Sequence, residues 1–181
     1  MSSTTGERVE NDFYPTPYNC VATLFEHIEF RPTDIFLEPC RGGGVISDIV
    51  PLPSNQKYYA EIEEGIDYLK TDFNTKFDVI ITNPPFSLTE EFLNKSFSEL
   101  KEDGTLIYLQ RINYLGSKKR ESFWNNIGFP NKLPVIIPRP KFIKGGSDSC
   151  EYGWFIWDKG NRVKNIPDGI SRLNTKDFSN D

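Results

Sequence analysis

The sequence predicts an α/β protein built on a mostly parallel β-sheet. Apolar runs with strand composition alternate with segments of helical spacing, and this alternation requires crossover connections between parallel strands. The clearest strand is the run 77–82, whose near-continuous apolar character is typical of a strand buried on both faces. A glycine-rich turn at 39–44, between a predicted strand and a short helix, is a further feature of this fold class.

The first predicted elements are a helix over 17–30 and a strand over 34–38. Pro17 suits the start of a helix, and four apolar residues follow at helical spacing, namely Val21, Leu24, Phe25 and Ile28. The turn at 39–44 leads into a short apolar helix that ends at Val50.

Strands are next expected over 57–61 and 77–82, and the segment between them is so short that the usual helix must be missing or very small. Ser87 with Glu90 three residues later predicts a capping box that opens a helix. The apolar residues of that helix predict its inward face: Leu88, Phe92, Leu93, Phe97 and Leu100.

The second half of the chain is predicted to complete the sheet. A turn at 102–104 precedes a strand at 105–110 and a basic helical stretch at 117–126. The runs 135–138 and 152–157 have strand composition with no helix between them, which predicts an antiparallel pair at the sheet edge.

Length and composition limit the possibilities. A chain of 181 residues is long enough for one domain with its own core, which we place at 1–160, and the polar tail 161–181 is expected to be loosely ordered. The net charge of −5 argues against a protein that coats nucleic acid through bulk electrostatics. Three widely spaced cysteines and one histidine predict neither a disulfide framework nor a metal site. The sequence contains no membrane span or signal peptide, so the protein is expected to be soluble and not secreted.

The four residues Asn83-Pro84-Pro85-Phe86 directly follow the buried strand, at the sheet end where ligands bind in open α/β folds. Two consecutive prolines remove backbone donors and keep the local carbonyls free as acceptors. An amide oxygen, a free carbonyl and an aromatic face suit a planar substrate that carries an NH2 group. The alternative is a tight proline turn with Phe86 as a core residue.

The glycine-rich turn Glu38-Pro39-Cys40-Arg41-Gly42-Gly43-Gly44 is the second candidate for ligand binding. Glycines let a ligand approach the backbone, and a following helix presents free amides; a glycine turn that only reverses the chain is the alternative. Glu61 closes the second predicted strand, where a carboxylate accepts hydrogen bonds from a ribose diol. A register shifted by two residues would place Glu63 there instead.

These motifs resemble those of amino-methyltransferases that use S-adenosylmethionine, whose signature is Asp or Asn, Pro, Pro and then Tyr, Phe or Trp. The resemblance covers roughly residues 12–110 and implies a Rossmann-like class I methyltransferase fold, with a seven-stranded sheet, an antiparallel edge hairpin and helices on both faces. It assigns catalysis to Asn83, Pro84, Pro85 and Phe86. It also implies that Glu38 faces the methionine ammonium or its water.

The resemblance further implies which residues hold the cofactor. Asp67 with Tyr68 is favoured over Asp72 with Phe73 for the adenine edge, and Thr16 in the segment 12–17 is the hydroxyl candidate for the methionine carboxylate. The full predicted set is Thr16, Pro17, Glu38, Pro39, Gly42, Gly44, Glu61, Asp67 and Tyr68.

The predicted reaction is methyl transfer to the exocyclic N6 amine of adenine in DNA. Asn83 Oδ1 and the Pro84 carbonyl accept the amine hydrogens and Phe86 stacks on the base, which must be flipped out or single-stranded. The segments 139–142 and 151–155 resemble small phage-type adenine methyltransferases. Locally basic and aromatic residues are the candidates for substrate contacts, namely Tyr114, Lys118, Arg139 and Phe142.

Alternatives remain open at this point. The same motif suits an RNA base or a protein glutamine, and a non-catalytic adaptor could keep the fold. The chain leaves little length for target recognition, so a protein partner could supply it. The expected location is the cytoplasm, or wherever a viral or host genome is replicated.

Overall fold

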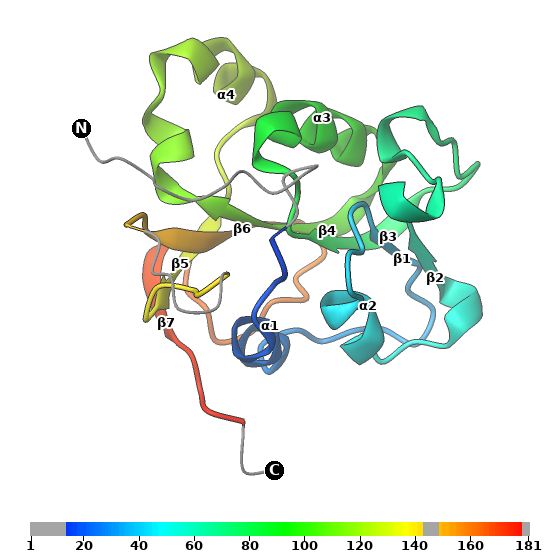
Figure 1. The fold of residues 1–181 in the computed structure, drawn as a ribbon, viewed down its shortest axis with the longest axis horizontal. Coiled ribbons are helices and arrows are strands. Elements are labelled where there is room, and N and C mark those ends of the chain that lie inside the picture. The colour runs from blue at the N-terminus through cyan, green and yellow to red at the C-terminus, as the bar shows by residue number, and fades with distance from the viewer. Residues whose placement is uncertain (1–13, 143–148, 179–181) are drawn as a thin grey trace.

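The computed structural model describes residues 14–142 and 149–178. A seven-stranded sheet forms the centre of the fold (Figure 1). The strand order is β2-β1-β3-β4-β6-β5-β7. The strands are β1 (Phe36–Glu38), β2 (Lys57–Tyr59), β3 (Phe77–Thr82), β4 (Leu100–Arg111), β5 (Lys132–Ile137), β6 (Tyr152–Asp158) and β7 (Gly169–Asn174). The predicted mostly parallel, seven-stranded sheet is therefore confirmed.

The direction of each strand follows from its pairings. β1 pairs in parallel with β2 and β3, and β3 pairs in parallel with β4. β6 runs antiparallel to both β4 and β5, whereas β5 and β7 are parallel. The predicted antiparallel pair is present as β5 and β6, but β7 lies outside it, so this pair is not the outermost part of the sheet.

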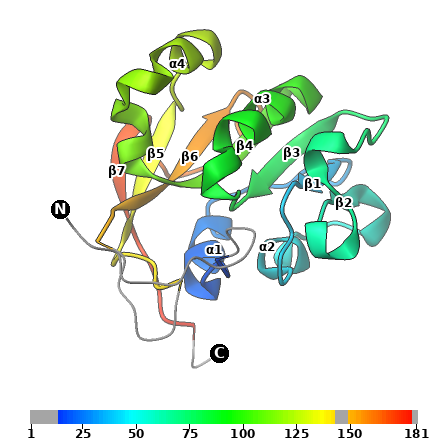
Figure 2. The same ribbon diagram turned by 45° about the horizontal axis from the view of Figure 1, so that its top comes forward.

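Different helices cover the two faces of the sheet (Figures 1 and 2). The helices α1 (Tyr18–Phe25) and α2 (Val45–Ile49) lie on one face, and α3 (Thr89–Glu99) and α4 (Glu121–Ile127) lie on the other. Side chains of one strand alternate between these layers, because successive residues point to opposite faces. Val79 and Ile81 pack in the core beneath α1 and α2, while Ile80 packs in the core beneath α3 and α4.

The connections differ in detail from the sequence prediction. Two short 3-10 turns, Ile62–Glu64 and Tyr68–Lys70, are the helical elements between β2 and β3, as expected for a missing or very small helix. β4 begins at Leu100, earlier than predicted, and includes the residues expected to form a turn at 102–104.

The predicted capping box at Ser87 is wrong. A 3-10 turn at Phe86–Leu88 follows the prolines, so α3 starts only at Thr89, and Glu90 pairs with Arg120 instead of capping. Leu88 is 38% exposed and does not face inward, in contrast to Phe92 and Leu93.

The first helix ends at Phe25 and not at residue 30, for a tertiary reason. Lys164 donates its backbone N–H to the carbonyl of His27, and Glu29 donates to the carbonyl of Arg162. These hydrogen bonds replace those that a longer helix would have made.

The prediction of a loosely ordered tail from about residue 160 is also wrong. Arg162 is fully buried and forms a bidentate ion pair with Asp34, with Nε to Oδ2 at 2.9 Å and Nη2 to Oδ1 at 2.8 Å. β7 then joins the sheet beside β5. The described residues from 161 through β7 therefore form part of the folded unit.

Candidate active site at the carboxyl ends of β1 and β3

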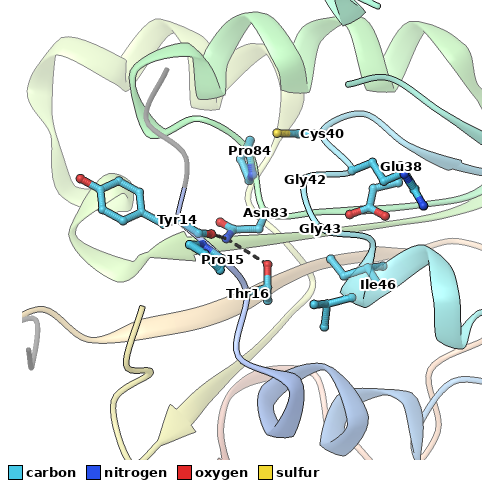
Figure 3. Close-up of a pocket in the computed structure, with 12 residues that line it drawn as sticks. Tyr14, Pro15, Thr16, Glu38, Cys40, Gly42, Gly43, Ile46, Asn83 and Pro84 are labelled. Carbon is cyan, nitrogen blue, oxygen red and sulfur yellow. Dashed lines mark hydrogen bonds between the residues drawn. The ribbon is translucent and has the colours of Figure 1, made fainter. Parts of the chain in front are cut away.

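The glycine-rich turn and the Asn-Pro-Pro-Phe segment lie side by side because they follow neighbouring parallel strands. β1 ends at Glu38 and β3 ends at Thr82, and these two strands pair directly. Both segments line one pocket together with the chain that leads into α1 (Figure 3). Its lining residues are Tyr14, Pro15, Thr16, Glu38, Cys40, Arg41, Gly42, Gly43, Val45, Ile46, Asn83 and Pro84.

The shape of the turn depends on two glycines with positive φ. Gly42 has φ 53° and Gly44 has φ 87°, a region that residues with a Cβ rarely adopt. A Cβ on Gly44 would lie 3.1 Å from the Asp48 carboxylate and 3.2 Å from Arg41. A Cβ on Gly43 would meet nothing within 4 Å, so the backbone there is open to a ligand.

Glu38 places a buried carboxyl group in the lining of this pocket. Ser47 donates to Glu38 Oε2 through its backbone N–H at 3.0 Å and through its hydroxyl. Burial raises the pKa of Glu38 to about 8, although the hydrogen bonds from Ser47 oppose this shift. No residue in the described part of the chain donates to Oε1, which is left for a donor or cation in the pocket.

The orientation of the Asn83 amide follows from its two partners. Nδ2 donates to the Tyr14 carbonyl at 3.0 Å and to Thr16 Oγ1 at 3.1 Å, as the dashed lines of Figure 3 mark. A backbone carbonyl only accepts hydrogen bonds, so the nitrogen and not the oxygen must face Tyr14. Oδ1 has no donor among residues 14–142 and 149–178 and remains an acceptor.

The carbonyl groups of the two prolines differ in their hydrogen bonding. The Pro85 carbonyl accepts the Leu88 N–H at 3.0 Å, which closes the 3-10 turn. The Pro84 carbonyl receives no hydrogen bond from any described residue. Pro84 is buried and lines the pocket, so two acceptors of adjacent residues, Asn83 Oδ1 and Pro84 O, are both available.

Phe86 belongs to a cluster of rings beside Asn83. Its ring lies 6.0 Å from that of Tyr14 at an interplanar angle of 20°, and 5.9 Å from that of Tyr152. Phe142 contacts Tyr14 and Tyr152, and Arg111 stands 5.2 Å from the centre of the Phe86 ring. This aromatic cluster contains the predicted catalytic Phe86 and the predicted substrate contact Phe142.

Besides Asp67 and Tyr68, four predicted cofactor residues lie outside the pocket lining, namely Pro17, Pro39, Gly44 and Glu61. Glu61 braces the glycine turn, because Oε2 accepts the Gly42 N–H at 2.5 Å and Oε1 accepts the Glu63 N–H at 3.1 Å. Pro17 precedes α1 and accepts backbone hydrogen bonds from its first turn. Pro39 is buried directly after β1.

The structure does not bring Asp67 and Tyr68 into the pocket lining. Asp67 caps its own 3-10 turn through the Leu69 N–H at 3.0 Å. Tyr68 is buried, and its hydroxyl bonds Ser96 at 3.0 Å and Glu99 at 2.6 Å. Asp72 accepts the Asn74 N–H in a local turn, so neither candidate for the adenine edge points to the pocket.

Three predicted substrate contacts lie away from the aromatic cluster or have partners of their own. Tyr114 is buried under Arg120, whose guanidinium carbon is 3.8 Å from the ring centre. Arg139 pairs with Glu151 through Nε at 3.0 Å. Lys118 is exposed in the 3-10 turn that precedes α4. The predicted segment 12–17 is described only from Tyr14 onward, and the basic residue Lys144 also lies outside the described residues.

Sequence reasoning missed Arg111 and Tyr152. They face each other across β4 and β6, and Arg111 Nε donates to the Tyr152 hydroxyl at 2.9 Å. Only the register of this antiparallel pair brings them to Phe86, and no local pattern encodes a register.

Comparisons with known proteins identify the fold. No protein-family model matches the sequence, and no curated protein matches it. Solved structures do match: a putative class I S-adenosylmethionine-dependent methyltransferase from Listeria monocytogenes is similar with a TM-score of 0.61 and 14% identity, over 96% of this chain and 69% of that one.

Two modification proteins of type I restriction enzymes are similar as well. The M protein of EcoKI matches with a TM-score of 0.61 and 14% identity over 91% of this chain. A modification subunit of a putative enzyme from Vibrio vulnificus matches with a TM-score of 0.60 and 15% identity over 90% of this chain. The chain spans about half the length of these two proteins, 49% and 46%. At such identities the similarity concerns the fold, which is the Rossmann-like class I methyltransferase fold.

Two further findings concern the described residues alone. None of their helices is long and apolar enough to cross a membrane. They contain no group of three or more histidine, cysteine, aspartate or glutamate side chains that could hold a metal ion.

Proposed function

We propose that the chain is an S-adenosylmethionine-dependent methyltransferase that modifies the exocyclic N6 amine of adenine in DNA, with the base flipped out or single-stranded. The orientation of Asn83 carries this proposal. Its amide nitrogen is held by Tyr14 and Thr16, so Oδ1 is presented as an acceptor beside the Pro84 carbonyl. Such a pair of acceptors suits a planar group with two N–H hydrogens.

The chemistry of the pocket fits S-adenosylmethionine. Once the Glu38 carboxyl group has lost its proton, its Oε1 suits the ammonium of an amino acid, and the open backbone at Gly43 suits a ligand that lies against it. Thr16 Oγ1 lies in the same lining and suits a carboxylate. When bound, this cofactor supplies a methyl group that is already activated.

The N-terminal segment must open to admit such a ligand. The cavity volume is about 50 Å³, whereas pockets for small molecules have roughly 300–1,000 Å³. Tyr14, Pro15 and Thr16 line the cavity opposite the glycine turn, as Figure 3 shows. We therefore expect Tyr14 and Pro15 to move outward as the cofactor enters and to return onto it afterward, so that the Tyr14 carbonyl again accepts from Asn83, while Thr16 stays next to the start of α1.

The residues around Asn83 would prepare the target amine. An exocyclic amine is conjugated with its ring, so its lone pair becomes nucleophilic only as the nitrogen turns tetrahedral. Asn83 Oδ1 and the Pro84 carbonyl would accept its two hydrogens and stabilise that geometry. Phe86 would stack on the base, and its neighbours Tyr152 and Arg111 hold its ring in place.

The structural neighbours support nucleic acid as the substrate. Two of them are modification proteins of restriction enzymes, which also makes a protein partner for target recognition part of this proposal. The predicted substrate contact Arg139 pairs with Glu151, and the basic residue Lys132 pairs with Asp168. Phosphate contacts would therefore fall to few residues, such as Lys118 and Lys141.

Asn83→Ala tests the proposal. We expect methyl transfer to adenine-containing DNA to be largely abolished, because one acceptor of the amine is lost, while the dissociation constant for S-adenosylmethionine stays within about threefold of wild type. Thr75→Val, an exposed change on the loop before β3, is the control and should retain full turnover. Unchanged turnover in Asn83→Ala would refute the catalytic role.

A further inference from the structure

We propose that Thr16 is a positioning residue for Asn83 and links the cofactor end of the pocket to the substrate amine. This inference rests on the proposed function and deepens it. The family resemblance implies a role of the Thr16 hydroxyl toward the cofactor, whereas the structure places this hydroxyl against the Asn83 amide at 3.1 Å.

The two hydrogens of the Asn83 amide nitrogen have two separate acceptors. The nitrogen lies 3.0 Å from the Tyr14 carbonyl oxygen and 3.1 Å from Thr16 Oγ1, so each hydrogen has an acceptor of its own. The pair of contacts holds the amide against rotation about its terminal bond, which is otherwise soft. Oδ1 is thereby kept in one direction, and this direction is what a target amine needs.

The Thr16 hydroxyl can serve both ends of the pocket at once. A hydroxyl accepts through its lone pairs and donates through its own hydrogen. Because the oxygen accepts from Asn83, the hydrogen is left to donate to an acceptor in the cavity that Thr16 lines. An anionic group there, such as a carboxylate, would strengthen the bond to Asn83 through cooperative polarisation.

Thr16 is itself held in place by the start of α1. The Pro17 carbonyl accepts the Cys20 N–H at 3.1 Å, and Cys20 and Val21 are buried in the core beneath the sheet. The hydroxyl therefore sits on a fixed support and not on a freely moving chain end.

This arrangement also predicts that the site needs an amide at position 83. The family signature allows Asp or Asn, but here the nitrogen donates to a carbonyl that has no hydrogen to give. An aspartate would direct a carboxylate oxygen at the Tyr14 carbonyl at about hydrogen-bond distance. We expect Asn83→Asp to be nearly as inactive as Asn83→Ala, although the signature permits it.

The test compares Thr16→Val, which keeps the shape and removes the hydroxyl, with Thr16→Ser, which restores it. At saturating S-adenosylmethionine, Thr16→Val should lower kcat for methyl transfer by about tenfold, the effect of roughly one lost hydrogen bond. KM for DNA should change by less than about twofold. Thr16→Ser should recover most of kcat, and Thr75→Val should match wild type.

A second readout needs no enzymatic activity. In ¹⁵N-edited NMR spectra, the side-chain NH2 signals of Asn83 should shift in Thr16→Val, and one of its hydrogens should exchange with water about fivefold faster. If kcat at saturating cofactor and the Asn83 signals both match wild type, Thr16 acts on the cofactor alone and the inference is wrong. The wild type and all variants could lack methyl transfer while the Asn83 signals still respond to Thr16→Val as described. That result would contradict the proposed function but support the contact between Thr16 and Asn83.

Discussion

Two polar side chains at the carboxyl ends of neighbouring strands each keep one oxygen without a donor among the described residues. Glu38 uses Oε2 for Ser47, and Asn83 uses Nδ2 for Tyr14 and Thr16. Glu38 is 2% exposed and Asn83 is half-buried, and both residues line the pocket, so their oxygens without donors are available to a ligand there.

The raised pKa of Glu38 predicts a dependence of stability on pH. Its pKa lies near 8 in the folded chain and near 4.5 without burial, so its stabilising contribution is fully present below about pH 4.5 and is lost as the pH rises through 8. Glu38→Gln should remove this loss, which amounts to the order of a few kcal/mol. Chemical denaturation of the wild type and of Glu38→Gln, at several pH values between these two limits, measures the loss of stability.

The exposed change Glu102→Gln serves as the matched control and should leave the profile of the wild type unchanged. Parallel profiles for wild type and Glu38→Gln would show that the protein does not hold this carboxyl group protonated.

At the scale of elements, two glycines of the turn are expected to have different roles. Gly44 has a positive φ and shapes the backbone, whereas Gly43 lines the pocket. Gly44→Ala introduces a Cβ at φ 87° and 3.1 Å from Asp48, so it should lower the free energy of unfolding by about 1–2 kcal/mol. Gly43→Ala meets nothing within 4 Å and should leave stability nearly unchanged, but it adds a methyl group to a residue that lines the pocket and should weaken S-adenosylmethionine binding. Thermal denaturation and calorimetric titration distinguish the two effects, and full affinity in Gly43→Ala would place the cofactor elsewhere.

The sequence predicted the elements that carry the site better than their ends. The strand 77–82 was placed with its observed bounds, and the turn at 39–44 lies where it was expected, because buried apolar runs and glycines act locally. The end of α1 and the start of α3 were misplaced. The first depends on hydrogen bonds between residues 27–29 and 162–164, and the second on a 3-10 turn after the prolines.

The predicted site residues also fall into two groups, those inside the pocket lining and those outside it. Asn83, Pro84, Glu38 and Gly42 lie in one pocket as the motifs implied. Asp67 and Tyr68 do not, because spacing along the chain does not say which direction a side chain takes after a short 3-10 turn.

At the scale of the whole molecule, Arg162 connects the last part of the chain to the sheet. It is 1% exposed and pairs with Asp34, and it also bonds the carbonyl of Asp103 at 3.0 Å. Burial alone would raise the pKa of Asp34, but the hydrogen bonds from Arg162 and from the Arg31 N–H outweigh it and lower that pKa.

Arg162→Met should therefore lower the free energy of unfolding by about 3–5 kcal/mol, because it leaves a buried carboxylate without its partner. Lys176→Met removes an exposed ion pair with Glu26 and is the matched control, with an expected loss below about 1 kcal/mol. Urea denaturation measures both. Equal losses in the two variants would mean that the buried pair does not anchor the C-terminal part of the chain.

The tail from residue 160 could not be predicted from local pattern. In β7, Leu173 is buried but Ile170 is 75% exposed, so the segment lacks the apolar run of an internal strand. Its place comes from backbone pairing with β5, from Lys132↔Gly169 to Ile137↔Asn174. Such long-range pairing is a property of the assembled sheet and not of the segment.

The central claim is tested most directly by methyl transfer itself. The wild-type protein and labelled S-adenosylmethionine should be incubated in parallel reactions with duplex DNA, single-stranded DNA, RNA or a protein substrate. The modified product should then be identified by mass spectrometry. We expect labelled N6-methyladenine in DNA. Label confined to RNA or protein would contradict the substrate, and measurable cofactor binding without any label would contradict the enzymatic role of this chain on its own.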